Sequence, residues 1–176
     1  LGCGMGRGRH TDALVRRLMD LPQPLVLDAD GINALAGHMD EWERRRGRVT
    51  VLTPHEGEFL RVGGDLSQGR TAAATEFAHQ SGAVVVLKGP GTVVAGPDGR
   101  CRVNTTGNCG MAKGGSGDVL SGVVLALLGL GMDALDACCC AVWLHGRAGD
   151  LAAQEKGQWG MTPTDLLERL PQALRE

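Results

Sequence analysis

Residues 67–87, SQGRTAAATEFAHQSGAVVVL, decide the fold class of this sequence. The first part, Ser67 to Gly82, is rich in alanine and stops at a glycine, which predicts a helix. The second part, Ala83 to Leu87, is an unbroken apolar run, which predicts a strand that is not half exposed to solvent. A helix that leads into such a strand is typical of α/β folds.

The same alternation recurs along the chain. Apolar runs at 25–27 and 49–52 each end in a polar loop before a helix, and a Gly-Pro-Asp-Gly turn joins two short strands after residue 92. Further helices are expected at residues 11–20, 118–130, 133–153 and from 165 to the end. We therefore predict one α/β domain, with a mainly parallel sheet covered by helices. Ligands bind beyond the carboxyl ends of strands in such folds, and the polar residues there are Asp28, Asp30, His55 and Lys88.

The composition argues against several classes of protein. The chain has 176 residues, 43% of them hydrophobic, and a net charge of -2, which suits a compact domain and gives no basis for binding nucleic acid or an acidic membrane. The basic cluster Glu43 to Arg48 is interpreted as a solvated loop, because no aromatic residues interleave with it. The longest apolar run, Val119 to Leu130, is too short for a membrane span of about 20 residues. Six cysteines without a Cys-x-x-Cys pair favour buried reduced thiols in a cytoplasmic protein.

A glycine run precedes one apolar helix, in MAKGGSGDVL (Met111 to Leu120). Amides at a helix start have no carbonyl partner within the helix, and glycines let successive N–H groups turn toward one ligand. Gly114 to Gly117 therefore predict an anion site that suits a phosphate. The run has neither the lysine of a P-loop nor the spacing of a dinucleotide fingerprint. Lys88 and Thr92 are expected to supply a cation and a hydroxyl to the same phosphates.

Asp118 follows the glycines, where a carboxylate would repel a bound phosphate unless it had a separate role. It can accept the proton of a hydroxyl that attacks phosphorus, as phosphoryl transfer requires. The alternative is a glycine-rich turn in which the aspartate merely favours the helix start. The Asn-x-x-Gly-Asn segment at 104–108, the cation of Lys88 and the apolar helix behind Asp118 favour a function. Because that helix is apolar all round, we expect it to be central and buried.

Two segments carry a resemblance to a known family: NTTGNCGMAKGGSGDVLSGVVLALLGLG (Asn104 to Gly131) and AVWLHGRAGD (Ala141 to Asp150). They resemble the ADP- or ATP-dependent NAD(P)H-hydrate dehydratases, a branch of the ribokinase-like superfamily. DADGIN, TPHEGEF, LKGPGTVV and MTPTDLL are similar to that family's other signatures, in the same order. The resemblance covers nearly the whole chain and implies a ribokinase-like three-layer fold, with helices on both faces of the sheet.

The resemblance implies the repair of a damaged cofactor. Water added across the nicotinamide ring of NADH or NADPH, in the S form of the hydrate, is removed at the expense of a nucleotide phosphate. Asp118 would deprotonate the ring hydroxyl for attack on the terminal phosphate of ADP, which gives AMP. The amides of Gly114 to Gly117 would hold the developing charge, and the phosphate ester would then leave as the ring nitrogen donates electrons. ADP is expected as the donor, with ATP as the alternative.

Binding residues follow from the same resemblance, position by position. The implied nucleotide-binding residues are Lys88, Gly89, Pro90, Gly91, Thr92, Gly114, Gly115, Ser116 and Gly117. The implied substrate-binding residues are Gly6, Asn33, His55 and Asp118. From its neighbours alone, His55 is equally well a helix-start histidine that is satisfied locally. His145 is interpreted as structural or as an interface residue, Asp150 as a helix-end or interface residue, and Trp143 and Trp159 as core or interface residues.

The resemblance has further implications for assembly and cofactors. Mg²⁺ is expected from the phosphate chemistry, and a cytoplasmic homo-oligomer such as a tetramer is expected from the family. We expect no nucleic-acid or membrane partner. The family's domain begins before its Gly-x-Gly segment, so residues 1–176 are expected to be one partial domain that lacks its N-terminal portion, with one sheet edge exposed.

Two other functions remain open at this point. One is a ribokinase-like kinase for a vitamin precursor, of the hydroxyethylthiazole kinase type, which would use the same anion site and the same aspartate. It would release a phosphorylated product and ADP. The other is a nucleotide sensor without catalysis, against which the presence of both Asp118 and Lys88 argues. TPHEGE and NCGMAKGGSGD favour the dehydratase.

Overall fold

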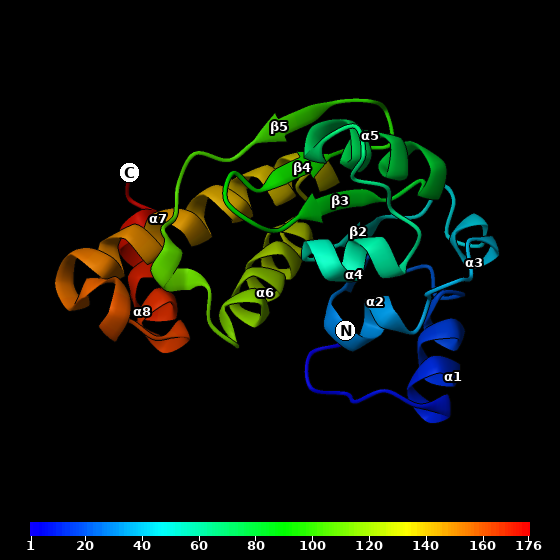
Figure 1. Cartoon of the computed structure of the whole chain (residues 1–176), viewed down its shortest axis with the longest axis horizontal. Helices are drawn as coiled ribbons and strands as arrows, with labels where there is room; N and C mark the ends of the chain where they lie inside the picture. The colour runs from blue at the N-terminus through cyan, green and yellow to red at the C-terminus, as the bar shows by residue number, and fades with distance from the viewer. The chain divides into compact units, whose positions relative to one another are not determined.

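The computed structural model describes all 176 residues. Its elements, shown in Figure 1, are α1 Arg9–Leu18, β1 Leu25–Leu27, α2 Ala29–Asn33, α3 Asp40–Glu43, β2 Thr50–Leu52, α4 Glu56–Arg61, α5 Arg70–Ser81, β3 Val84–Leu87, β4 Val93–Ala95, β5 Cys101–Val103, η1 Cys109–Met111, α6 Ser116–Gly129, α7 Ala134–Gly160 and α8 Pro163–Ala173. They form two compact units. The first unit consists of residues 1–89 and 93–103, and the second of residues 90–92 and 104–176.

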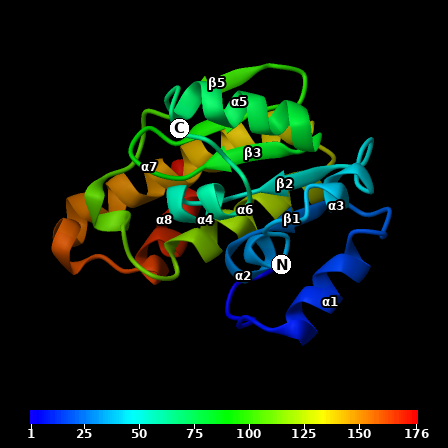
Figure 2. The ribbon, with the colours of Figure 1, turned by 45° about the vertical axis from the view of Figure 1, so that its right-hand side comes forward.

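The first unit contains one five-stranded sheet in the order β1-β2-β3-β4-β5. Strands β1, β2 and β3 pair in parallel, and β4 is antiparallel to both of its neighbours. Four of the five strands therefore run in one direction, with β4 reversed, as the neighbouring strands in Figures 1 and 2 show. The mainly parallel α/β sheet expected from the sequence is confirmed.

The strands are as buried as their apolar sequences predict. Strands β2, β3 and β4 are buried at every position, so the residues that point to either face of the sheet are covered. Strand β5 is partly exposed, which fits its place at one edge of the sheet. The helix predicted at 67–82 is α5, and it ends at Gly82 in the left-handed conformation that glycine adopts at low cost.

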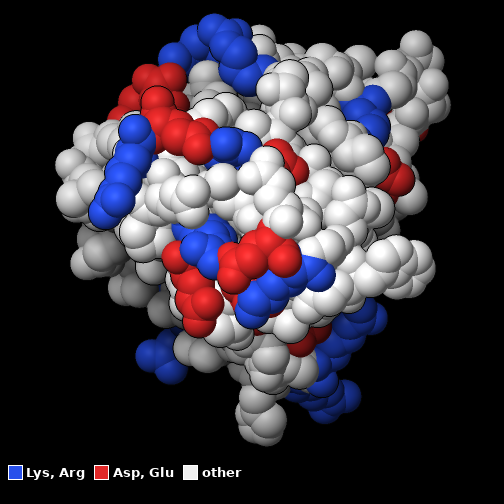
Figure 3. Space-filling model, turned by 90° about the vertical axis from the view of Figure 1, so that its left-hand side faces the viewer, with Lys and Arg blue, Asp and Glu red and all other residues white.

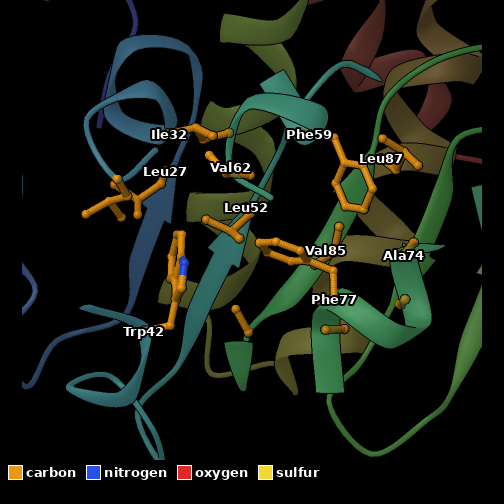
Figure 4. Close-up of a cluster of buried hydrophobic side chains, with 14 of the residues drawn as sticks. Leu27, Ile32, Trp42, Leu52, Phe59, Val62, Ala74, Phe77, Val85 and Leu87 are labelled. Atoms are coloured by element: carbon orange, nitrogen blue, oxygen red, sulfur yellow. The ribbon is translucent and has the colours of Figure 1, made fainter. Parts of the chain in front are cut away.

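A cluster of aromatic and aliphatic side chains forms the core of the first unit (Figure 4). The ring of Phe77 on α5 lies 5.3 Å from that of Phe59 on α4 and 6.3 Å from that of Trp42 on α3, measured between centroids. Leu52 and Val85 reach this cluster from the sheet. The short helices α2, α3 and α4 are thus held by burial, since helices of this length are marginal alone.

Arg45 corrects the expectation that residues 43–48 form a solvated loop. Its side chain is 1% exposed. The guanidinium donates to the carbonyl oxygens of Leu21, Gln23 (2.9 Å) and Val49 (2.8 Å) and to Oγ1 of Thr50 (3.0 Å). Burial and the charge of Arg48 lower the pKa of Arg45. The cluster therefore fastens the connections before β1 and β2.

The second unit consists of η1 and three helices that pack on one another. Helix α6 corrects a second expectation, because only the stripe Ser116, Leu120, Val124 and Leu128 is buried. Leu125 is 54% exposed and Leu130, just beyond the helix, is 79% exposed. The apolar composition of α6 therefore did not show that every face of this helix is buried. No helix of the structure combines the length and the apolar character that a membrane crossing needs.

Several side chains lie nearer the surface than expected. Trp143 is partly exposed and Trp159 is 98% exposed, so neither is a core residue. The six cysteines are thiols, and Cys3 and Cys109 are exposed. Cys138 is buried, and desolvation raises the pKa of its thiol. The prediction of buried thiols is therefore right for only part of the set.

Candidate functional site

The glycine run lies at the start of α6. Gly115 precedes the helix in the left-handed conformation (φ 96°), and no side chain caps the helix. The helix begins at Ser116, two residues before the predicted start, so Ser116, Gly117 and Asp118 form its first turn. Amides in a first turn lack helical carbonyl partners, which makes them donors for an anion. Asp118 is exposed at this turn.

Contacts within the second unit hold this run in place. Lys113 donates from Nζ to the carbonyl oxygens of Trp159 (2.9 Å) and Met161 (2.5 Å), just before α8. A Cβ atom at Gly115 would lie 3.1 Å from Cγ of Pro163, so this glycine also permits a close approach to α8. The bare backbone of the run is therefore anchored on both sides of Gly114.

His145 has the structural role predicted for it. Its ring lies 8% exposed on α7, with Nε2 2.8 Å from the carbonyl oxygen of Ser116. This contact ties α7 to the first turn of α6. Oγ of Ser116 is buried without a hydrogen-bond partner, and such groups are rare in folded proteins.

Asp150 corrects the prediction of a helix-end residue. It lies inside α7, where its carboxylate accepts hydrogen bonds from the amide of Gly107 (3.0 Å) and from Nδ2 of Asn108 (2.9 Å). Asn108 in turn accepts from the amide of Gly110 through Oδ1 (3.0 Å). The Asn-x-x-Gly-Asn segment is thus fastened to α7 before it leads into the glycine run.

The small residues of α7 permit this attachment. A Cβ atom at Gly146 would lie 2.2 Å from Oγ1 of Thr106, and one at Gly149 would lie 2.3 Å from Sδ of Met111. The packed partner at these two glycines is therefore the segment before α6, with Thr106 in its extended part and Met111 in η1.

In the first unit, Lys88 lies between two carboxylates. Its Nζ is 2.7 Å from Oδ1 of Asp28, which follows β1, and 3.9 Å from Oε2 of Glu58 on α4. Its amide donates to the carbonyl oxygen of Pro54 (2.8 Å). Asp28 and Glu58 are almost fully buried. We call Asp28, Glu58 and Lys88 the β-end ion cluster; its formal net charge is -1.

His55 caps α4, and its backbone pairs with that of Lys88 in an isolated parallel β-bridge. Its Nδ1 accepts hydrogen bonds from the amides of Gly57 (3.0 Å) and Glu58 (3.3 Å), so this nitrogen carries no proton. Oε2 of Glu58 accepts from the amide of His55 (2.9 Å), which completes a capping box. The local role that the neighbours of His55 suggested is therefore confirmed. Nε2 lies 3.4 Å from Oε1 of Glu58, and about half of the side chain is exposed.

Gly6 and Asn33 each have a partner in the first unit. The amide of Gly6 donates to Oδ2 of Asp30 (2.9 Å), and Oδ1 of Asn33 accepts from Arg61. The sequence had marked Asp30 only as a polar residue after a strand. Its contact shows how the Gly-x-Gly segment is attached to the start of α2.

The stretch 88–92 turns sharply between β3 and β4. Gly89 has φ 149° and Gly91 has φ 61°, values that favour glycine. The carbonyl oxygen of Thr92 accepts from the amide of Asn104 (2.9 Å). Sequence reasoning missed Arg70, whose Nη2 donates to the carbonyl oxygen of Leu87 (2.9 Å) beside this stretch. The sequence signal that could have identified Arg70 is its positive charge at the first position of a helix, where the helix dipole makes a cation unfavourable.

Charged side chains of both signs are mixed on the surface shown in Figure 3. Figure 3 shows acidic and basic side chains next to one another on one face of the molecule, with uncharged surface between the groups. The chain as a whole carries a net charge of -2. That face offers no extended basic surface of the kind that binds nucleic acid.

Nearly all residues of this chain match known proteins. The family model described as NAD(P)H-hydrate dehydratase matches residues 1–172. The bifunctional NAD(P)H-hydrate repair enzyme Nnr of Thermofilum pendens is 46% identical over 180 residues, which cover 99% of this chain and 34% of that protein. The chain therefore spans about a third of the length of this relative.

Solved structures agree with this match. The ADP/ATP-dependent NAD(P)H-hydrate dehydratase of Bacillus subtilis, co-crystallised with ATP and Mg²⁺, matches with a TM-score of 0.86 and 36% identity, over 99% of this chain and 62% of that chain. A ribokinase-like superfamily protein of Enterococcus faecalis matches with a TM-score of 0.83 and 25% identity, over 99% of this chain and 61% of that chain. The fold is ribokinase-like, as expected, and the chain belongs to the NAD(P)H-hydrate dehydratase family.

Proposed function

We propose that this chain carries out the ADP-dependent dehydration of the S form of hydrated NADH or NADPH. The observation that carries the proposal is Asp118, an exposed carboxylate in the first turn of an uncapped helix that opens in a glycine run. A base and the amides of an uncapped helix start are thus held by one element, α6, although the amide of Ser116 donates to the carbonyl oxygen of Lys113 (3.2 Å). Membership of the dehydratase family and the name of the Bacillus relative support the same activity.

The proposed reaction assigns one role to each part of this turn. Asp118 accepts the proton of the ring hydroxyl, whose oxygen forms a bond to the terminal phosphorus of ADP while the bond from that phosphorus to AMP breaks. Amides of Gly114 to Gly117 stabilise the charge on the transferred phosphoryl group. The ring nitrogen then donates electrons as the carbon–oxygen bond breaks and phosphate leaves. Loss of a proton from the adjacent ring carbon restores the dihydronicotinamide.

The remaining assignments are also proposals. Residues 88–92 bind the nucleotide, and His55, Gly6 and Asn33 contact the hydrated dinucleotide. Nε2 of His55 supports a role as a hydrogen-bond donor to the substrate, because Nδ1 is already engaged; the substrate would compete with Oε1 of Glu58, which lies 3.4 Å from Nε2.

Mg²⁺ fits the phosphate site proposed at the start of α6. The ion commonly binds through phosphate oxygens and water together with few protein ligands. The uncapped helix start would hold the phosphates that carry the ion, which leaves Asp118 free to act as the base. Bound with the nucleotide, Mg²⁺ would neutralise part of the phosphate charge. The name of the Bacillus complex supports the pairing of a nucleotide with this ion.

The test measures recovery of reduced nicotinamide absorbance. The full-length protein is mixed with hydrated NADH, Mg²⁺ and either ADP or ATP, beside Asp118→Asn and the control Asp136→Asn. Asp136 is an exposed aspartate in the first turn of α7, so it matches Asp118 in setting. Loss of the base is expected to lower the rate by about 100-fold or more, whereas the control stays near wild type.

Two results would contradict the proposal. The first is a folded protein that binds nucleotide but restores no NADH with either donor. Formation of ADP and a phosphorylated thiazole alcohol from ATP would then point to the vitamin-precursor kinase. The second is an Asp118→Asn variant as active as Asp136→Asn, which would remove Asp118 from the chemistry.

A further inference from the structure

Arg70 occupies a position that the stability of α5 does not explain. It is the first residue of the helix, where the partial positive charge of the helix dipole disfavours a cation. No side chain caps α5, and its first turn contains no acidic residue. Another contact must therefore account for a guanidinium at this place.

The guanidinium lies against the end of β3. Its Nη2 donates to the carbonyl oxygen of Leu87 at 2.9 Å, and the Arg70 side chain is 24% exposed. A Cβ atom at Gly89 would lie 2.7 Å from Nη2 and 3.1 Å from Cζ of Arg70. The guanidinium thus fills the space that a side chain at position 89 would need. It is the cation that lies directly beside the first glycine of the stretch 88–92.

The charge of Lys88 is already compensated in the first unit. The β-end ion cluster has a formal net charge of -1, because one ammonium lies between Asp28 and Glu58. A nucleotide that reaches residues 88–92 would meet this net negative charge. A second cation is needed there for phosphate binding to be favourable, and Arg70 provides it.

The ion pair that Arg70 forms is suited to exchange. Its Nε lies 3.3 Å from Oε1 of Glu56, whose side chain is 53% exposed. Because the Glu56 carboxylate is exposed, it returns to water when the pair opens, and pairs with such an exposed partner contribute little to stability and are screened by salt. A phosphate carries more charge than a carboxylate and also accepts two parallel hydrogen bonds from a guanidinium.

We propose that Arg70 binds a phosphate of the nucleotide and that Glu56 is the partner it releases on binding. The inference rests on the proposed function, because it takes residues 88–92 to be the nucleotide stretch. It adds a phosphate-binding residue from α5 to that stretch and gives Glu56 a competing role. Removing Arg70 and removing the charge of Glu56 should therefore change affinity in opposite directions.

The experiment is a calorimetric titration of the full-length protein with ADP at low and high salt. Variants are Arg70→Gln, Arg70→Lys and Glu56→Gln. The matched controls are Arg46→Gln and Glu43→Gln, since Arg46 and Glu43 form an exposed ion pair elsewhere in the first unit. Arg70→Gln is expected to raise the Kd for ADP about 10- to 100-fold. Arg70→Lys should retain part of the affinity, because lysine keeps the positive charge but cannot donate two parallel hydrogen bonds as the guanidinium does.

Glu56→Gln carries the discriminating result, a Kd for ADP about 2- to 5-fold lower than wild type at low salt, since a competing charge is removed. The controls should stay within about twofold, and the differences should shrink at high salt. If wild type binds ADP and Arg70→Gln binds equally well, the inference is wrong and the proposed function stands. If Glu56→Gln weakens ADP binding as Arg70→Gln does, the pair is structural and the inference is also wrong.

Two further outcomes are covered by the design. Wild type that binds neither ADP nor ATP would overturn the proposed function and, with it, the role of Arg70. If Arg70→Gln does not fold, as judged by thermal unfolding, Arg70→Lys and Glu56→Gln decide the question. Equal ADP affinity for these two variants and wild type would overturn the inference.

Discussion

Replacing Arg45 with methionine tests whether a buried cation fastens the connections before β1 and β2. Methionine keeps most of the apolar length of the side chain and removes all of its donors. The carbonyl oxygens of Leu21, Gln23 and Val49 and the hydroxyl of Thr50 then lose the guanidinium as a donor. Val49 keeps the amide of Leu25 (3.0 Å), and the Thr50 hydroxyl keeps its bond to the carbonyl oxygen of Arg48 (3.3 Å). Local packing is otherwise little changed, so the result reports on the hydrogen bonds.

The size of the effect follows from the four acceptors. A buried acceptor left without a donor costs about 1–3 kcal/mol. Three of the four bonds are only partly buried, so water can replace the guanidinium in part, and Thr50 keeps a second hydrogen bond. The lower value of about 1 kcal/mol therefore applies to all four. We expect Arg45→Met to lower the free energy of unfolding by about 4 kcal/mol, a large fraction of the about 5–15 kcal/mol typical of a native protein.

Urea unfolding of Arg45→Met beside Arg46→Met measures this loss. Arg46 is the next residue, is about half exposed and pairs with the exposed Glu43, so its replacement should change the unfolding midpoint far less. The slope of unfolding free energy against urea should stay the same for both variants. A loss below about 1 kcal/mol for Arg45→Met, or equal losses for the two variants, would refute the reasoning.

Two further predictions concern the second unit. Gly146→Ala puts a Cβ atom 2.2 Å from Oγ1 of Thr106 and should lower the free energy of unfolding by about 1–3 kcal/mol in a urea titration. The control is Gly160→Ala, whose Cβ atom meets nothing within 4 Å. An equal loss of stability in both variants would contradict this explanation. The hydrogen bond from Lys156 lowers the pKa of Asp165 from 3.8 to about 2. The contribution of the Asp165 carboxylate to stability is therefore present above pH 3.8 and is lost as the pH falls through about 2. Unfolding free energies measured from pH 5 to 2 should fall less steeply for Asp165→Asn than for wild type. Parallel curves for the two proteins would exclude this role of Asp165.

Much of the fold could be predicted because apolar runs and glycine stops are local signals. β1 lies at the predicted residues, and the predicted strands at 49–52 and 83–87 are shorter by one residue each. The helix α3 was missed, because four residues carry no periodicity and Trp42 is held by partners distant in sequence. The burial of Arg45 was missed for a similar reason, since two of its acceptors, Leu21 and Gln23, lie more than 20 residues earlier in the sequence.

The candidate site was predictable where one segment contains it. The glycine run and Asp118 lie together in sequence, so their placement at the start of α6 followed from the motif. Arg70 and Glu58 were missed because their contacts join residues that are 17 or more positions apart. The exposed face of α6 was missed as well, because composition does not say which side of a helix is covered.

The attachment of residues 104–111 to α7 has an evolutionary consequence. Gly146 and Gly149 leave no room for a side chain beside Thr106 and Met111. A larger residue on α7 is tolerated only if the opposite position becomes smaller, because the interior cannot absorb the added volume. In related sequences, the residues at these paired positions, about 40 residues apart, should therefore change together. A substitution on α7 should keep the glycine run in place only when residues 104–111, which lead into that run, change with it.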